Sequence, residues 1–292
     1  MKNYSANNIE IINTQAVATA TEDTRISADL LLQENLAMLK KLRMPQMAKT
    51  LSESFGESHF MGLGFLQQMN VLLSSEITSR ADSGYHRRLK KAQLACSATP
   101  ELIRERLKDY GLSASAFEYL MSSRWIEEGK EVIIIGKSGL GKTDLASAML
   151  DAACRNGLTA RHFDYSMKMF ELTEYYARGG STELYHQTLA EMSGNSVVML
   201  DDVCLGVKRE GEATVFKDVM SELRERHRCG LILISQKSPD EWHRFLGGDK
   251  IADAVLDRVL NRSYLIKLDG DSKRASKPDD VNGQGGSSHD KD

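Results

Sequence analysis

The stretch that most restricts the fold of this chain is EVIIIGKSGLGKTDLASAML, from Glu131 to Leu150. An aliphatic run ends at a glycine, the pattern G-x-x-x-x-G-K-[ST] follows, and an apolar helical pattern then begins. A strand that leads through a glycine-rich loop into a helix is the setting in which a P-loop binds phosphate groups. The sequence therefore predicts a strand, loop and helix that hold a nucleoside triphosphate.

Each residue type in the predicted loop suits contact with phosphate. Glycines permit backbone conformations that side chains forbid, so that successive N–H groups converge on phosphate oxygens. Lys142 would place a positive charge near the β and γ phosphates, and Thr143 would offer its hydroxyl to Mg²⁺. The predicted nucleotide-binding residues are Gly136, Lys137, Ser138, Gly139, Leu140, Gly141, Lys142 and Thr143.

Two carboxylates follow the apolar run VVMLDD, which ends at Asp201 and Asp202. In a parallel sheet, Asp201 would stand at the carboxyl edge, where it can reach the metal and its bound water beside Thr143. Asp202 would face the γ-phosphate and orient or deprotonate the attacking water. We therefore predict that Asp201 helps to hold Mg²⁺ and that Asp202 is catalytic.

A later apolar run ends in LISQ and places Ser235 and Gln236 at the same predicted edge. Either side chain could bond to the γ-phosphate or the water; Gln236 is slightly preferred, and the choice stays open. The sequence contains no N-K-x-D motif for guanine recognition, because the aspartate of QKSPD comes one place too late. ATP is therefore the predicted nucleotide.

The segment ADAVLDRVLNRS carries arginines in a helical pattern. In ATPases of this kind a neighbouring subunit often supplies an arginine to the γ-phosphate, which adds ~10³ to 10⁵ in rate. Arg258 is the first candidate for this catalytic role, followed by Arg262 and Arg274. An ordinary ion pair explains any one of these arginines at least as well.

Five β-rich runs alternate with helical patterns from about Trp125 onward, at residues 132–135, near 159, at 196–200, from 230 and from 263. Continuous apolar strands separated by helices indicate a parallel sheet covered on both faces. The predicted fold class is α/β, with an ATPase domain over residues 113–269. Helical spacing of apolar residues predicts an all-helical domain over 29–112, and polar, aperiodic residues predict disordered tails at 1–28 and 270–292.

A basic cluster, HRRLKKAQLA, lies near the end of the predicted helical domain. The net charge of the chain is −3, so contact with nucleic acid would have to come from such a local patch. Arg87, Arg88, Lys90 and Lys91 are the predicted phosphate contacts of a DNA-binding surface. A solvated helix face is an equally good explanation.

Four widely spaced cysteines with no C-x-x-C pair suggest neither a zinc site nor a disulfide framework. The first residues contain no apolar signal region, and no run of 18 apolar residues occurs anywhere. We therefore expect a cytoplasmic protein with free thiols and no membrane partner.

The order of these motifs resembles that of the IstB-like ATP-binding proteins, helper ATPases encoded beside transposases and related to DnaC-type helicase loaders. The resemblance covers roughly residues 31–274 and is most specific in IADAVLDRVLNRSYLIKLDGDSKR. It implies an AAA+ core with an N-terminal helical domain, ATP-dependent assembly of a homo-oligomer on double-stranded DNA, and recruitment or stimulation of a cognate transposase.

Carried over by residue, Lys142 and Thr143 match the Walker A positions of the family, Asp201 and Asp202 match the Walker B positions, and Arg258 matches the expected arginine finger. Two positions depart from the pattern. Asp202 stands where many AAA+ proteins have glutamate, which shortens the reach to the water, and Asp144 stands where many relatives have histidine.

Three other functions compete with a DNA-dependent transposition ATPase. A helicase loader would share the core chemistry and differ in its partner. A small-molecule kinase would also need a P-loop, but no arginine-rich lid segment follows the acidic strand. A nucleotide switch without hydrolysis is consistent with the short Asp202 side chain.

Overall fold

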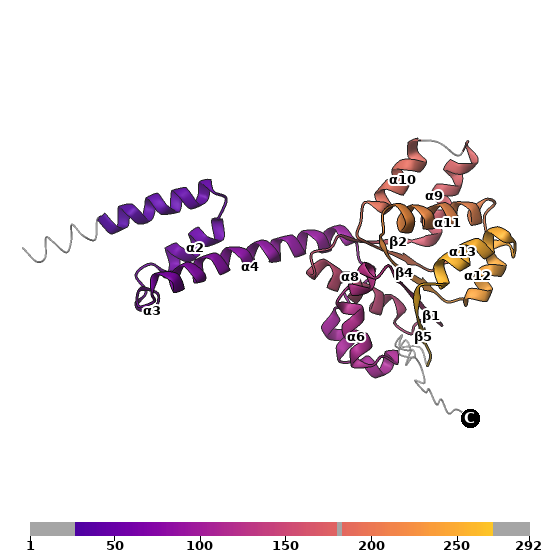
Figure 1. Cartoon of the computed structure of the whole chain (residues 1–292), viewed down its shortest axis with the longest axis horizontal. Helices are drawn as coiled ribbons and strands as arrows, with labels where there is room; N and C mark the ends of the chain where they lie inside the picture. Colours follow the sequence, from indigo (N-terminus) through magenta and orange to yellow (C-terminus); the bar gives the residue numbers. More distant parts are fainter. Residues whose placement is uncertain (1–26, 180–182, 271–292) are drawn as a thin grey trace, which may run out of the picture. The chain divides into compact units, whose positions relative to one another are not determined.

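The computed structural model describes residues 27–179 and 183–270 (Figure 1). The chain forms two compact units, which meet in sequence between Gly84 and Tyr85. Within the described residues, no helix combines the length and the apolar character needed to cross a bilayer. The two predicted tails lie outside the described residues, except for residues 27–28, which begin a helix, and Gly270; Arg274 also lies outside them.

The first unit is helical. It contains a helix at residues 27–41, then α2 (Pro45–Ser54), α3 (Ser58–Met61) and the first part of α4 (Phe65–Ala92). Its small core consists of Met47, Phe60 and Leu72. The buried carboxylate of Glu76 accepts hydrogen bonds from the backbone N–H groups of Gln46 and Met47, both at 2.9 Å. These bonds occupy amides at the start of α2 that have no partner inside the helix, and they lower the pKa of Glu76.

The second unit is built on a five-stranded parallel sheet in the order β2-β3-β4-β1-β5. This sheet confirms the five predicted β-rich runs and the predicted α/β class. The strands are β1 (Glu131–Gly136), β2 (Ala160–Asp164), β3 (Val197–Asp201), β4 (Gly230–Ser235) and β5 (Ser263–Leu268).

Helices cover both faces of the sheet (Figure 1). Side chains of β1 to β4 alternate between two cores, whereas β5 contributes only Ile266 and Leu268, both to the same core. On β1, Val132 and Ile134 belong to one core, while Ile133 and Ile135 belong to the other. The elements that contribute to the first core are α5 (Pro100–Arg104), η1 (Leu107–Tyr110), α6 (Ala114–Met121), α7 (Arg124–Glu127) and α8 (Lys142–Arg155). Those that contribute to the second are α9 (Tyr165–Ala177), α10 (Glu183–Ser193), α11 (Glu212–Met220), η2 (Ser221–Arg226), α12 (Pro239–Leu246) and α13 (Lys250–Leu260).

The last two turns of α4 belong to the sheet unit. The hydroxyl of Tyr85 donates to Asp151 Oδ1 at 2.7 Å, and Arg88 Nε donates to the carbonyl of Cys154 at 2.9 Å. Both acceptors lie on α8, so this end of α4 is attached to the helix that follows the phosphate-binding loop. The compact unit therefore begins at residue 85, whereas the sequence predicted a domain boundary between residues 112 and 113.

We expect Gly230→Ala to destabilise the sheet unit, because an added Cβ would lie 2.7 Å from Ile126 Cγ1 and 3.0 Å from a ring carbon of buried Trp125. Overpacking of this kind costs about 1–3 kcal/mol. Urea unfolding followed by tryptophan fluorescence measures the loss, since both tryptophans, Trp125 and Trp242, lie in this unit. In an Ile126→Ala background the cost should be smaller; an equal cost in both backgrounds would contradict the steric explanation.

Candidate nucleotide-binding site

The predicted phosphate-binding loop connects β1 to α8 and bends sharply just before the helix. Gly141, the residue before α8, has a φ of +86°, a conformation that favours glycine. A Cβ at this position would also lie 2.9 Å from the hydroxyl oxygen of Tyr110. The turn therefore depends on Gly141 for two reasons, and it directs the N-terminal end of α8 toward the loop, where anions are favoured.

Lys142 is buried and folds back over the loop. Its Nζ donates to the carbonyl oxygens of Gly136 and Lys137, both at 2.8 Å. The ammonium group thus lies across the mouth of the loop that its own backbone forms. A phosphate oxygen entering the loop would compete with these two carbonyls for the same donor.

Thr143 and Asp201 meet at the carboxyl edge of the sheet, as predicted from their positions. The Thr143 hydroxyl donates to Asp201 Oδ2 at 3.1 Å. Burial raises the pKa of Asp201, the neighbouring carboxylate of Asp202 raises it further, and the bond from Thr143 opposes both effects. A hydroxyl and a carboxylate are hard oxygen donors, and the second carboxylate adds negative charge, so this donor set fits Mg²⁺.

A pocket of about 260 Å³ opens beside this pair. Its lining residues are Ser138, Gly139, Gly141, Lys142, Thr143, Asp144, Asp202 and Gln236. Gln236 Nε2 donates to Asp202 Oδ1 at 3.3 Å. Asp202 has a φ of +56°, a left-handed conformation that aspartate tolerates better than most residues. The pocket thus brings the P-loop, one predicted catalytic carboxylate and one predicted polar sensor together.

The structure separates the two candidates at the end of β4. Ser235 is buried, its hydroxyl donates to the carbonyl of Val203 at 2.7 Å, and it accepts from Trp242 Nε1 at 3.0 Å. It also accepts from the backbone N–H of Lys237 at 3.1 Å. These bonds give Ser235 a structural role, whereas Gln236 lines the pocket.

Sequence reasoning missed two contributors to the surroundings of the loop. Tyr110 comes from η1, before the first strand, and its buried ring reaches the last turn of the P-loop. The second is Cys96, whose Sγ lies 3.3 Å from Oδ1 of Asp144, the residue that follows Thr143 in the sequence. Neither residue carries a motif, and only the packing of residues 92–112 against α8 brings them here.

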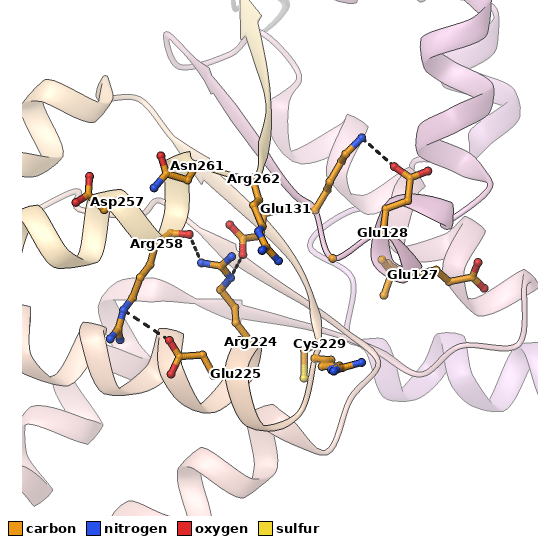
Figure 2. Close-up of a pocket in the computed structure, with 14 residues that line it drawn as sticks. Glu127, Glu128, Glu131, Arg224, Glu225, Cys229, Asp257, Arg258, Asn261 and Arg262 are labelled. Atoms are coloured by element: carbon orange, nitrogen blue, oxygen red, sulfur yellow. Dashed lines mark hydrogen bonds and ion pairs between the residues drawn. The ribbon is translucent and has the colours of Figure 1, made fainter.

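Arg258 lies in a different pocket, of about 780 Å³, at the edge of the sheet where β1 begins (Figure 2). Its guanidinium group donates to the Ser221 hydroxyl, and its Nε is 3.6 Å from a carboxylate oxygen of Glu225. Arg262 lines the same pocket. Because β1 begins in this pocket and ends at the P-loop, neither arginine lies beside the P-loop pocket of its own chain.

The pocket also holds a buried ion pair between Glu131 and Arg224, whose guanidinium group donates in addition to the carbonyl of Arg258 (Figure 2). Burial raises the pKa of Glu131 to about 7, against the opposing effect of Arg224. Arg224 comes from η2, a π-helical turn after α11.

The four predicted DNA contacts do not have equal surroundings. Arg87, Lys90 and Lys91 are exposed on the last turns of α4. Arg88 is half-buried, and its Nε bonds to the carbonyl of Cys154 near the end of α8. Arg88 therefore has a structural contact, while the other three side chains are accessible.

Comparisons with known proteins agree with the geometry of the loop. The model of the IstB-like ATP binding protein family matches residues 37–279. A putative ATP-binding protein in an insertion sequence of Mycobacterium tuberculosis is 30% identical over 241 residues, which cover 82% of this chain and 93% of the relative. A putative ATP-binding protein of insertion sequence IS21 from Pseudomonas aeruginosa is 25% identical over 244 residues, which cover 83% of this chain and 89% of that protein.

Among solved structures, AMPPCP-bound DnaA from Aquifex aeolicus is similar with a TM-score of 0.45 and 20% identity, over 62% of this chain and 53% of that chain. The family match spans most of the chain, including the P-loop, Asp201 and Asp202 at the end of β3, Arg258 in the last turn of α13 and Arg262 just after it. The chain has the predicted α/β fold, a parallel five-stranded sheet with the P-loop between β1 and α8, and it belongs to the family of IstB-like ATP binding proteins.

Proposed function

We propose that this protein is an ATPase that assembles on double-stranded DNA in its ATP-bound form and recruits or stimulates a transposase. The observation that carries the proposal is the convergence of Lys142, Thr143, Asp202 and Gln236 on one pocket, with Asp201 beside it. The names of the relatives place them in insertion sequences, which is where a transposase partner would be encoded.

The described contacts assign a task to each side chain. The Lys142 ammonium group leaves the carbonyls of Gly136 and Lys137 and donates instead to oxygens of the β and γ phosphates, a charge-assisted contact. Backbone N–H groups of the loop donate to the same phosphates. Thr143 and Asp201 would hold Mg²⁺, which when bound neutralises charge on the β and γ phosphate oxygens. Asp202 accepts a proton or a hydrogen bond from the attacking water. Gln236, already bonded to Asp202, orients that water or the γ-phosphate.

The distance between the P-loop pocket and the pocket that holds Arg258 supports assembly of several copies of the chain. The arginine candidates, Arg258 and Arg262, lie at the edge of the sheet opposite the P-loop, so a second copy of the chain has to supply them. The charge that such an arginine brings to the transition state is worth ~10³ to 10⁵ in rate in enzymes that use one. A homo-oligomer on DNA would therefore turn over faster than a single chain. Arg258 remains the first candidate, and its ion pair with Glu225 would have to open.

The exposed cations of α4 support the DNA-binding part of the proposal. Arg87, Lys90 and Lys91 are within two turns of one another and are accessible. The same end of α4 is bonded to α8, the helix that starts at the P-loop. DNA would thus contact the end of α4, nucleotide would contact the start of α8, and the two helices are joined by hydrogen bonds.

Phosphate release by the full-length protein, measured with and without duplex DNA, tests the proposal. We expect DNA to stimulate release and a slowly hydrolysed ATP analogue to produce an oligomer on DNA, detected by sizing. ATP binding without any phosphate release on DNA would instead support a nucleotide switch. Co-purification with a helicase would favour a loader, and a phosphorylated small-molecule product would favour a kinase.

Lys142→Ala and Asp202→Asn should separate nucleotide binding from hydrolysis. The alanine variant loses a charge-assisted phosphate interaction with a net worth of about 1.5–3 kcal/mol, so ATP affinity should fall by about 10- to 150-fold. The asparagine variant keeps the size of Asp202 but cannot accept the water proton. It should bind ATP normally, release phosphate at least about 100-fold more slowly and stay on DNA longer. Normal turnover in either variant would contradict the site assignment.

Ser235→Ala and Gln236→Ala form a matched pair at the end of β4. The serine change leaves Trp242 Nε1 and the Lys237 amide without their acceptor, so it should lower the free energy of unfolding by about 1–3 kcal/mol. It should leave turnover of the folded protein unchanged. The glutamine change should slow turnover without affecting thermal stability. The reverse outcome would show that Ser235 is the sensor.

Replacing Arg87, Lys90 and Lys91 with alanine should weaken DNA binding and flatten its salt dependence. Each lost phosphate contact lowers the slope of log affinity against log salt concentration by about 1, so the triple variant should lose about 3. A control variant removes the same charge at three exposed cations on other elements, Arg178, Arg244 and Lys250. Equal slopes for the two variants would support the alternative interpretation, in which the α4 cluster is a solvated helix face.

A further inference from the structure

A histidine beside the candidate metal site has a ring nitrogen that forms no hydrogen bond with any residue in the described part of the chain. His162 lies on β2, the edge strand next to β3. Its Nε2 is hidden from solvent, and the described residues offer it no partner. Buried polar atoms are almost always hydrogen-bonded, so Nε2 is placed to take a water or an ion as its partner.

Strand register brings this ring to the same face of the sheet as Asp201. His162 pairs with Met199 in the parallel ladder, and Met199 is two residues before Asp201 on β3. Paired residues and residues two apart on a strand share a face, so His162, Met199 and Asp201 all face the side that α8 covers. Thr143, at the start of α8, bonds to Asp201 on that face. The imidazole also lies close enough to Asp201 to interact electrostatically with its carboxylate.

The other ring nitrogen fixes the tautomer. His162 Nδ1 lies 3.2 Å from the backbone carbonyl oxygen of Gln93, the residue directly after α4. A carbonyl only accepts, so Nδ1 carries the proton in this bond. In the neutral ring Nε2 is then an acceptor. A histidine held through Nδ1–H by a backbone carbonyl is a common arrangement around metal sites, where it sets the orientation of the ring.

Mg²⁺ suits a partner of this type. It gives up its waters reluctantly and is usually held by one or two protein oxygens with several waters retained. Thr143 and Asp201 provide two oxygens, and the retained waters need acceptors for their O–H groups. A buried, oriented acceptor on the same face of the sheet supplies one of them.

We propose that His162 is a positioning residue of the nucleotide site, whose Nε2 accepts a hydrogen bond from a water of the Mg²⁺ that Thr143 and Asp201 hold. The inference rests on the proposed function, because it requires a magnesium-bound nucleotide in the P-loop. It also assigns a role to the bond with Gln93, which ties the metal site to the end of the helix that carries the exposed cations.

Two substitutions distinguish the roles of the two ring nitrogens. His162→Asn keeps an amide donor near the position of Nδ1 and removes the acceptor at Nε2. His162→Gln places an amide oxygen near the position of Nε2 and loses the short reach to Gln93. For each full-length variant, binding of a fluorescent, slowly hydrolysed ATP analogue is measured in EDTA and then as a function of Mg²⁺ concentration.

We expect His162→Asn to raise the Mg²⁺ midpoint by about 10-fold or more, the usual effect of removing an outer-shell partner of a metal. Its nucleotide affinity in EDTA should equal that of the wild type, and His162→Gln should keep a midpoint closer to that of the wild type. An unchanged midpoint in His162→Asn overturns the inference, as do equal shifts in both variants. A loss of affinity in EDTA indicates a structural role and overturns it as well. A wild-type chain that binds no nucleotide overturns the proposed function together with the inference. If the wild-type chain binds nucleotide in a magnesium-dependent way and His162→Asn has the same midpoint, only the inference is overturned.

Discussion

The hydrogen bond between Thr143 and Asp201 joins two segments that are 58 residues apart, the start of α8 and the end of β3. Its existence depends on the parallel sheet, because only parallel strands deliver all their carboxyl ends to one edge. The apolar residues that bury both faces of the sheet therefore also assemble the site. In β1 the alternation of Val132 and Ile134 with Ile133 and Ile135 fills two separate cores, and the strand then ends at the loop.

Much of this arrangement could be predicted from the sequence, because it follows from local patterns. The five apolar runs predicted the strands, and the spacing of glycine, lysine and threonine predicted the turn before α8. Two acidic residues after an apolar run were enough to place Asp201 beside Thr143. These features depend on residues that are neighbours in sequence or on the general rule for parallel sheets.

Other features depend on side chains that meet only in the folded chain. Ser235 and Gln236 are adjacent, and no local pattern says that Trp242 takes the serine hydroxyl while the glutamine faces the pocket. Likewise, Arg88 looks like its basic neighbours until the carbonyl of Cys154 comes within reach. The end of the first unit at Gly84 falls inside α4, where an uninterrupted helical pattern gives no sign of a boundary.

Strand β1 begins at Glu131, which pairs with Arg224 in the larger pocket, and ends at Gly136, where the phosphate-binding loop starts. It is hydrogen-bonded along its length to β4 on one side and to β5 on the other, so it cannot bend without breaking the ladders around it. A push on Glu131 would consequently travel along the strand as a rigid displacement. In the oligomer proposed above, these six residues would connect the pocket that carries the arginine candidates to the loop that holds the nucleotide.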